Sequence, residues 1–373
     1  MEKEKIYTKT NPADEKLCIR EQFQLREKNF LSKFGVLSTK AKRRDETKNI
    51  CNIRTPFQLD RDSIVYSNSF RRLKHKTQAF LSPLGDHYRT RLTHTLEVVE
   101  ISRNIARAMR LNEDLAEAIA LGHDLGHTPF GHGGEKALIE IYSSHFSHSD
   151  QSLRVVDFLE NRGKGLNLTM EVRDGILKHS KGLAKKFENI LPSTPGETAI
   201  TIEGRIVRIA DSIAYLNHDL DDALRGKVIM PADVPDICVQ TLGKTHSQRA
   251  SRMIEKLVYN SGEKNDKFIL SMGEDTFHAM IILGKFLNDK VYRSSVVHNE
   301  FLKAKKIITG LYNYFLDNPD VLQKELEKME MASWDSLKNP LKRSVCDLIA
   351  SMTDRYALNL YAKLFFPRPF PMA

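Results

Sequence analysis

The sequence contains no apolar run of the roughly 18 residues that a membrane-spanning helix requires. Only four cysteines occur among 373 residues, and no two of them form a C-x-x-C pair. The first eleven residues, MEKEKIYTKTN, contain no apolar segment like that of a secretory signal. We therefore expect a cytoplasmic protein that has no membrane partner, no disulfide framework and no thiolate zinc site.

Two common nucleotide-binding loops are also missing. Gly243-Lys244-Thr245 resembles the end of a P-loop, but Cys238 stands where that motif needs its first glycine. No G-x-G-x-x-G sequence occurs either. P-loop and Rossmann-type sites are therefore excluded as the basis of function.

Charge is distributed unevenly along the chain. Residues 1–91 carry 21 Lys and Arg against 11 Asp and Glu, whereas the remaining residues are close to neutral. Such a basic segment attracts anions, including nucleic acid. The chain shows no helix-turn-helix or zinc-finger pattern, so nucleic acid remains only an accessory partner. We expect the lysine-rich stretch Lys40–Lys48 to be solvated.

Helical periodicity dominates the chain. After His94, apolar residues recur at steps of three and four through Val98, Ile101 and Ile105, as one face of a helix requires. Hydrophobic residues make up 41% of the sequence, enough for a sizeable core. The fold class is therefore predicted to be mainly α. Further helices are expected at 112–123, 135–142, 150–161, 169–179, 198–224, 248–259, 275–287, 294–316 and 338–364.

Few segments alternate as strands do, and Lys267–Ser271 is the best candidate. The Gly- and Pro-containing stretches 181–197 and 262–266 are the expected breaks between helical units. We divide the chain into a basic N-terminal arm (1–53), a catalytic core (54–225) and a C-terminal helical region packed on that core (226–373).

Histidine is concentrated in one part of the chain. Seven of the 13 histidines lie between residues 87 and 148, where uniform scatter would place about two. Among them are His94 on one expected helix and the adjacent pair His123-Asp124 at the end of the next, and Asp211 follows on a third. Imidazole and carboxylate together bind Mg, Mn, Fe, Ni or Zn, and helical bundles commonly hold such sites. These four residues predict a site for one divalent cation.

The order of these residues resembles a known family. H…HD…D is the signature of HD-domain phosphohydrolases, and the surrounding sequence is similar to the deoxyguanosinetriphosphate triphosphohydrolase branch. The similarity covers much of the chain, over the segments 54–62, 69–78, 89–94, 123–135, 151–156 and 173–179. The resemblance implies an α-helical HD-domain bundle with additional helices. It also implies hydrolysis of dGTP, and of other dNTPs, to deoxynucleoside and tripolyphosphate.

The chemistry of such a reaction assigns roles to nearby residues. A bound Mg, Mn or other transition metal would activate water and polarise the α-phosphate. The deoxynucleoside needs a general acid at O5′, and His132 is the residue that matches the family, with Glu135 orienting it. His127 lies between and contacts either the metal-bound water or phosphate. The alternative for His132 and Glu135 is a helix-capping arrangement.

Substrate contacts follow from the resemblance and from helix spacing. Asp211, Tyr215 and Asp219 are four residues apart, so they share one helix face and match the deoxyribose site of the family. Arg91 and Lys178 suit the triphosphate. Gln78 resembles the family residue near the sugar. The basic residues between Phe70 and Thr77 either line the site or pair with carboxylates elsewhere, and they are Arg71, Arg72, Lys74 and Lys76.

Two alternatives of other classes remain open. Another HD-domain nucleotide phosphohydrolase, such as a 5′-nucleotidase, shares the metal residues without needing the Tyr215 and Asp219 helix face. A noncatalytic nucleotide sensor is the second. The resemblance further implies a homo-oligomer, often a hexamer, with an allosteric nucleotide or single-stranded DNA as an additional partner.

Overall fold

The structure, a computed structural model, describes residues 17–46, 51–78, 89–180, 198–332 and 340–367. Helices dominate these residues, and their only paired strands are β1 (Gly262–Lys264) and β2 (Lys267–Ile269) in an antiparallel hairpin. The mainly α class is therefore confirmed. None of the described helices combines the length and the apolarity needed to cross a lipid bilayer.

The first half of the chain supplies the helices that surround the histidine-rich segment. In chain order these are α1 (Ile19–Phe30), α2 (Pro56–Tyr66), α3 (Asn68–Arg72), α4 (Arg91–Ala108), α5 (Glu113–Gly122), α6 (His132–Ile141), α7 (His148–Arg154), α8 (Glu160–Gly163) and α9 (Met170–Lys178). Short 3₁₀ turns cover Ser38–Lys40 and Leu73–His75, and a π-helical turn covers Val155–Leu159.

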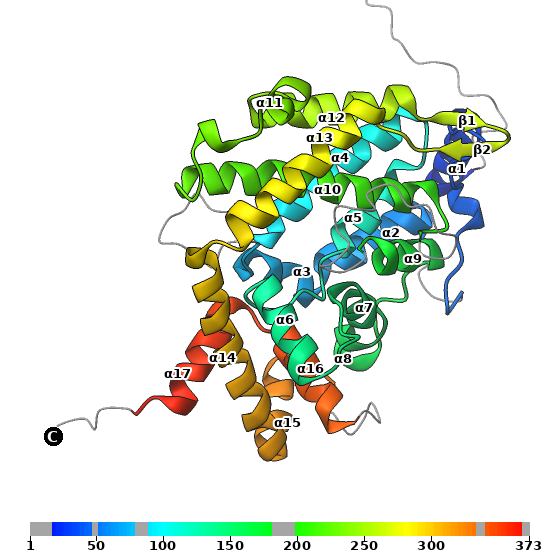
Figure 1. Cartoon of the computed structure of the whole chain (residues 1–373). Coiled ribbons are helices and arrows are strands. Elements are labelled where there is room, and N and C mark those ends of the chain that lie inside the picture. The colour runs from blue at the N-terminus through cyan, green and yellow to red at the C-terminus, as the bar shows by residue number, and fades with distance from the viewer. Residues whose placement is uncertain (1–16, 47–50, 79–88, 181–197, 333–339, 368–373) are drawn as a thin grey trace, which may run out of the picture.

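The second half begins with the long helix α10. The remaining helices are α10 (Ile202–Arg225), α11 (Asp236–Leu242), α12 (His246–Asn260), α13 (Glu274–Leu287), α14 (Ser295–Asp317), α15 (Pro319–Lys328), α16 (Leu341–Ser351) and α17 (Asp354–Phe365). A 3₁₀ turn covers Pro231–Asp233 and a π-helical turn covers Asn288–Tyr292. Helices α11–α13 lie at one end of the molecule and α14–α17 at the other (Figure 1).

Helix α5 shows why this sequence forms a tight bundle. Its N-cap residue Asn112 accepts a hydrogen bond from Leu115 N at 3.1 Å, and Glu113 and Asp114 complement the helix dipole in the first turn. From Leu115 onward nearly every side chain is buried, and three of them are alanines. These small residues let α2 and α4 pack closely on either side. The turn that follows α5 is thereby placed in the core.

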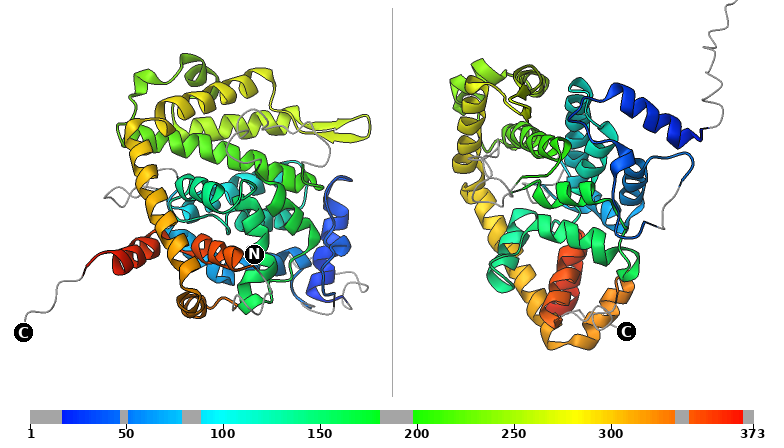
Figure 2. Two further views of the ribbon diagram at one scale, coloured as in Figure 1. Left: turned by 60° about the horizontal axis from the view of Figure 1, so that its bottom comes forward. Right: turned by 90° about the vertical axis from the view of Figure 1, so that its right-hand side faces the viewer.

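Helix α10 crosses the middle of the molecule and packs on α4, α5 and α9 (Figures 1 and 2). Thr201 caps it by accepting from Gly204 N at 3.1 Å. Most of its residues are buried, and these include several ionisable groups as well as the expected aliphatic stripe. Because a buried polar group is costly without a partner, α10 must lie against other polar groups.

The structure corrects three expectations. The helix expected at 338–364 is two helices, because Met352 is extended and Thr353 caps α17 by accepting from Tyr356 N. The expected break at 262–266 is the β hairpin. The stretch Lys40–Lys48 is not wholly solvated, since Arg43 is buried with its Nη1 2.6 Å from Asp60 Oδ1. The other expected break, 181–197, lies outside the described residues.

Gly126 shows how closely the turn after α5 is packed. A Cβ atom at this position would lie 2.1 Å from Ser152 N and 2.3 Å from the carbonyl carbon of Gln151. Both neighbours belong to the backbone of α7, so neither can move aside freely. The close approach also lets Gly126 N donate to Ser152 Oγ at 2.9 Å.

We predict that Gly126→Ala lowers the free energy of unfolding by at least the roughly 1–3 kcal/mol typical of overpacking. Chemical denaturation of purified protein measures this. Gly262→Ala is the matched control, because a Cβ there would meet no atom within 4 Å. Equal stability of the two variants would contradict the packing described for the turn.

Candidate metal and phosphate site

The four residues expected to bind a metal come from three parts of the fold. His94 lies on α4, His123 and Asp124 follow α5, and Asp211 lies on α10. Ligand atoms of the first three all lie within 4.8 Å of one another. His94 Nε2 is also 3.0 Å from Asp211 Oδ1. The structure therefore brings all four residues to one place.

The donor atoms of this group fit a cation. His123 Nδ1 lies 2.6 Å from Ala120 O in its own helix, so this nitrogen carries the proton and Nε2 has a free lone pair. His123 Nε2 is buried and has no hydrogen-bond partner. A buried nitrogen lone pair without a partner is unfavourable, and a divalent cation would satisfy it. Two imidazoles and two carboxylates form a donor set suited to Mg, Mn or a later transition metal.

Arg91 lies directly beside these donors. Its Nη1 is 2.5 Å from Asp124 Oδ2, and both side chains are almost fully buried. Burial opposes the charge of Asp124, but Arg91 and the nearby histidines hold the pKa of this carboxyl well below its usual range. Arg91 Nε and Nη2 are buried without hydrogen-bond partners. A buried guanidinium with unused donors is suited to bind an anion such as phosphate.

A second polar group surrounds Glu135 on α6. His148 Nδ1 lies 2.8 Å from Glu135 Oε1, and His132 Nδ1 is 3.6 Å from Glu135 Oε2. Burial lowers the pKa of His148, but the carboxylate beside it outweighs burial and raises that pKa overall. Burial and the charge of Arg91 instead hold the pKa of His127 well below its usual range. The pKa values of His148 and His127 thus shift in opposite directions, although the two rings are stacked with their centroids 4.5 Å apart.

The turn that carries His123 and His127 is held from two distant parts of the chain. Buried Lys76 donates from Nζ to His127 O and to Ala350 O. Asp354, at the start of α17, accepts from Phe130 N at 2.8 Å through Oδ1 and from Thr77 N at 3.0 Å through Oδ2. The C-terminal helices therefore fix the backbone of the site.

Tyr215 and Asp219, the α10 residues expected to contact the sugar, are buried, and Tyr215 lies near His132. The Tyr215 ring centroid is 6.2 Å from that of His132 and 5.8 Å from that of Tyr292. Asp219 is fully buried, and its Oδ2 accepts a short hydrogen bond from Tyr292 Oη. In the structure Asp219, which we expected to contact the sugar, is thus bonded to the Tyr292 hydroxyl.

The other expected contact residues divide into two groups. Gln78 is buried with its Oε1 unpartnered, and its backbone oxygen would lie 2.5 Å from a Cβ at Gly131, directly before His132. Lys178 instead forms an ion pair with Asp174 at 2.6 Å. Gln78 thus lies against Gly131 in the loop that leads into α6, whereas Lys178 is paired within its own helix, α9.

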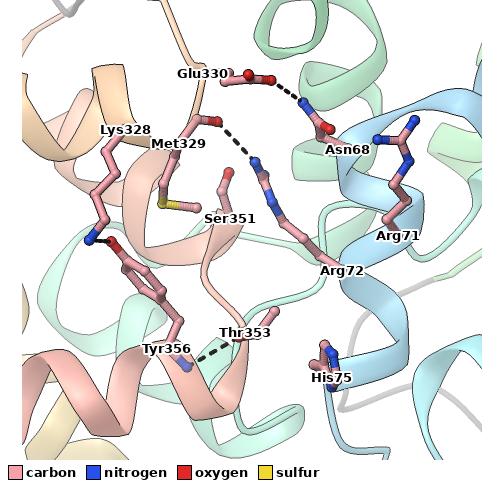
Figure 3. A pocket seen from close by; sticks show the side chains of 10 residues that line it. All are labelled: Asn68, Arg71, Arg72, His75, Lys328, Met329, Glu330, Ser351, Thr353 and Tyr356. Atoms are coloured by element: carbon pink, nitrogen blue, oxygen red, sulfur yellow. Dashed lines mark hydrogen bonds between the residues drawn. The ribbon is translucent and has the colours of Figure 1, made fainter.

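Among the hydrogen bonds of the basic residues between Phe70 and Thr77, the one from Lys76 to His127 O reaches the turn that carries His123 and His127. Arg71 and Arg72 line a different pocket, of about 400 Å³, together with Lys328 and Tyr356 (Figure 3). There Arg72 Nη2 donates to Met329 O at 3.1 Å. The two arginines therefore belong to a surface away from the metal donors.

Sequence reasoning missed three residues of the site. His148 was detectable, because it is one of the seven clustered histidines. His218 was also detectable, since it lies seven residues after Asp211 on the same face of α10. Tyr292 lies 73 positions from Asp219, and no local pattern links the two.

Comparisons with known proteins identify the family of the chain. The HD domain model matches residues 91–216, and the phosphohydrolase-associated domain model matches residues 270–363. A deoxyguanosinetriphosphate triphosphohydrolase-like protein of Desulfatibacillum aliphaticivorans is 58% identical and covers 95% of this chain and 99% of its own. A protein described in the same words from Caldanaerobacter subterraneus is 48% identical, covering 94% of this chain and 97% of its own. A third such protein, from Clostridium tetani, is 39% identical, covering 95% of this chain and 98% of its own.

The donor geometry predicts that His123→Ala weakens Mn²⁺ binding by more than the roughly 10–100-fold typical of losing a supporting residue. Isothermal titration of metal-free protein measures the dissociation constant. His145→Ala is the control, because His145 is another of the clustered histidines but is exposed. Wild-type affinity in His123→Ala would show that the cation binds elsewhere.

Proposed function

Because the chain belongs to the HD-domain family of deoxyguanosinetriphosphate triphosphohydrolase-like proteins, we propose that it is a metal-dependent dNTP triphosphohydrolase. It would hydrolyse dGTP, and other dNTPs, to deoxynucleoside and tripolyphosphate. The observation that carries this proposal is the buried Arg91, which has unused donors directly beside the candidate metal ligands. This pairing suits a phosphate chain held by a cation on one side and a guanidinium on the other.

His94, His123, Asp124 and Asp211 would hold one divalent cation. When bound, it would supply an activated water and polarise an α-phosphoryl oxygen. Arg91 would hold the phosphate chain and offset the charge that develops during transfer. It would do so without losing its bond to Asp124, because its Nε and Nη2 are unused.

His132 is proposed as the general acid. Water oxygen bonds to the α-phosphorus while the bond from phosphorus to O5′ breaks, and the leaving oxygen needs a proton. His132 would deliver that proton, with Glu135 orienting its ring from 3.6 Å. Burial raises the pKa of Glu135, but His148 and His132 beside it outweigh burial and hold that pKa well below its usual range. His127 would contact phosphate as a neutral imidazole.

Lys178 and Gln78 are proposed as outer contacts to the triphosphate and the sugar. Lys178 would have to exchange its ion pair with Asp174 for phosphate. The unpartnered Oε1 of Gln78 supports a role in accepting a hydrogen bond from substrate. The names of the relatives point to dGTP as substrate. The preference for guanine is therefore also a proposal.

We predict that metal-loaded protein incubated with each dNTP yields tripolyphosphate and deoxynucleoside. Attack at the α-phosphorus with loss of O5′ leaves all three phosphates joined, which phosphorus NMR resolves from pyrophosphate. His123→Ala, prepared identically, controls for contaminating phosphatases. Accumulation of dNMP with pyrophosphate would instead indicate another HD-domain reaction, and lack of turnover with retained nucleotide binding would indicate a sensor.

Sugar selection is proposed to depend on Tyr215 and Asp219. A close-packed ring at C2′ leaves no room for a 2′-hydroxyl, and Asp219 would accept from the 3′-hydroxyl. In this structure Asp219 Oδ2 already accepts from the Tyr292 hydroxyl, so the 3′-hydroxyl would either share this oxygen or displace the Tyr292 hydroxyl from it.

We predict that Tyr215→Ala lowers dNTP turnover and reduces the ratio of dNTP to NTP hydrolysis by roughly tenfold, the lower range for steric discrimination by a pocket. Turnover of each dNTP and its matching NTP under equal metal loading gives this ratio. Tyr259→Ala is the control, because Tyr259 is 85% exposed on α12. An unchanged ratio in Tyr215→Ala would place the sugar reader elsewhere.

A further inference from the structure

His218 on α10 lies between a metal ligand and a buried carboxylate. Its Nε2 is 2.8 Å from His94 Nδ1, and its Nδ1 is 2.7 Å from Asp219 Oδ1. All three side chains are buried. The row Asp219, His218, His94 therefore ends at the ring whose Nε2 faces Asp211.

The chemistry of this row fixes the proton on each ring. The carboxylate oxygen 2.7 Å from His218 Nδ1 favours a proton on that nitrogen over a lone pair, because its negative charge attracts the N–H and repels a lone pair. Asp219 acts on this nitrogen through its charge, since the contact does not meet the geometry of a hydrogen bond. With the proton on Nδ1, His218 offers a lone pair at Nε2, and His94 Nδ1 is the donor. His94 Nε2 is left with the lone pair that a cation needs.

The two histidine ligands thus obtain the right tautomer by different means. His123 donates to Ala120 O, three residues earlier in its own helix. His94 makes its contact across the bundle, to a residue 124 positions away. If its proton lay instead on Nε2, that nitrogen would donate to Asp211 Oδ1 at 3.0 Å and could not bind a cation.

We propose that His218 is a positioning residue for the metal site, which fixes the orientation and tautomer of His94 and is itself oriented by Asp219. This rests on the proposed metal site. Hydrogen bonds from a ligand histidine to a supporting group commonly raise metal affinity. Asp219 also uses its two oxygens differently, because Oδ1 contacts His218 and Oδ2 accepts from Tyr292.

Near-isosteric variants test whether the acceptor atom matters. Gln at position 218 retains an acceptor for His94 Nδ1, whereas Met fills similar space without a comparable one. We expect His218→Met to raise the Mn²⁺ dissociation constant by about 10–100-fold and His218→Gln to raise it much less. Isothermal titration and the EPR signal of free Mn²⁺ measure this without turnover, and circular dichroism verifies folding.

His246→Ala is the matched control, because His246 Nδ1 contacts a neighbouring α10 carboxylate, Asp221, at 3.2 Å without reaching the metal donors. It should leave Mn²⁺ affinity unchanged. Equal affinity of His218→Met and wild type would overturn the proposal. So would an equal loss in the Met and Gln variants, because ring packing would then explain the effect.

A second variant decides the matter if His218→Met does not fold. Asp219→Asn keeps the side-chain shape but removes the charge that orients His218, so it should also weaken Mn²⁺ binding. A role of Asp219 in sugar binding alone would raise KM and leave Mn²⁺ affinity unchanged, and that result would overturn the proposal. Failure of wild-type protein to bind Mn²⁺ would instead defeat the metal site itself.

Discussion

The cost of burying charge is the constraint on which the site depends. Asp124, Glu135 and Asp219 are all removed from water, and an isolated carboxylate in such a place is strongly destabilising. Each carboxylate has a compensating group, namely Arg91, His148 and Tyr292 respectively. The residues of these pairs come from α4, α6, α7 and α10, from the turn after α5 and from the π-helical turn that ends at Tyr292. The packing of these elements therefore also sets the electrostatics of the site.

The same pairing separates a place for a cation from a place for an anion. Asp124, His127 and His148 also have ligand atoms within 4.8 Å of one another. In this second group the guanidinium of Arg91 is paired with Asp124, and the pKa of His148 is raised. The positive charge of Arg91 disfavours a second cation there and favours an anion. Asp124 thus belongs to both groups of ligand atoms and pairs with Arg91.

Much of this architecture could be predicted from the sequence, because helical periodicity is a local pattern and the order of His94, His123-Asp124 and Asp211 resembles that of a known family. The mainly α class and most long helices follow from that periodicity. The division of 338–364 into two helices depended on Thr353, whose capping role competes with an otherwise continuous apolar pattern. Contacts such as Tyr292 with Asp219 join distant segments, and no periodicity encodes them. The roles assigned to His132 and Tyr215 remain predictions.

The bonds of Asp354 have a consequence for the order in which the protein is made. This carboxylate joins Phe130 and Thr77 across 224 and 277 positions of sequence. A ribosome synthesises the chain from the N-terminus, so the metal donors emerge long before the residue that fixes their loop. The early segments can form helices on the ribosome, since helix formation is local and fast. The finished geometry of the site must wait until α17 has left the exit tunnel, long after the metal donors themselves have emerged.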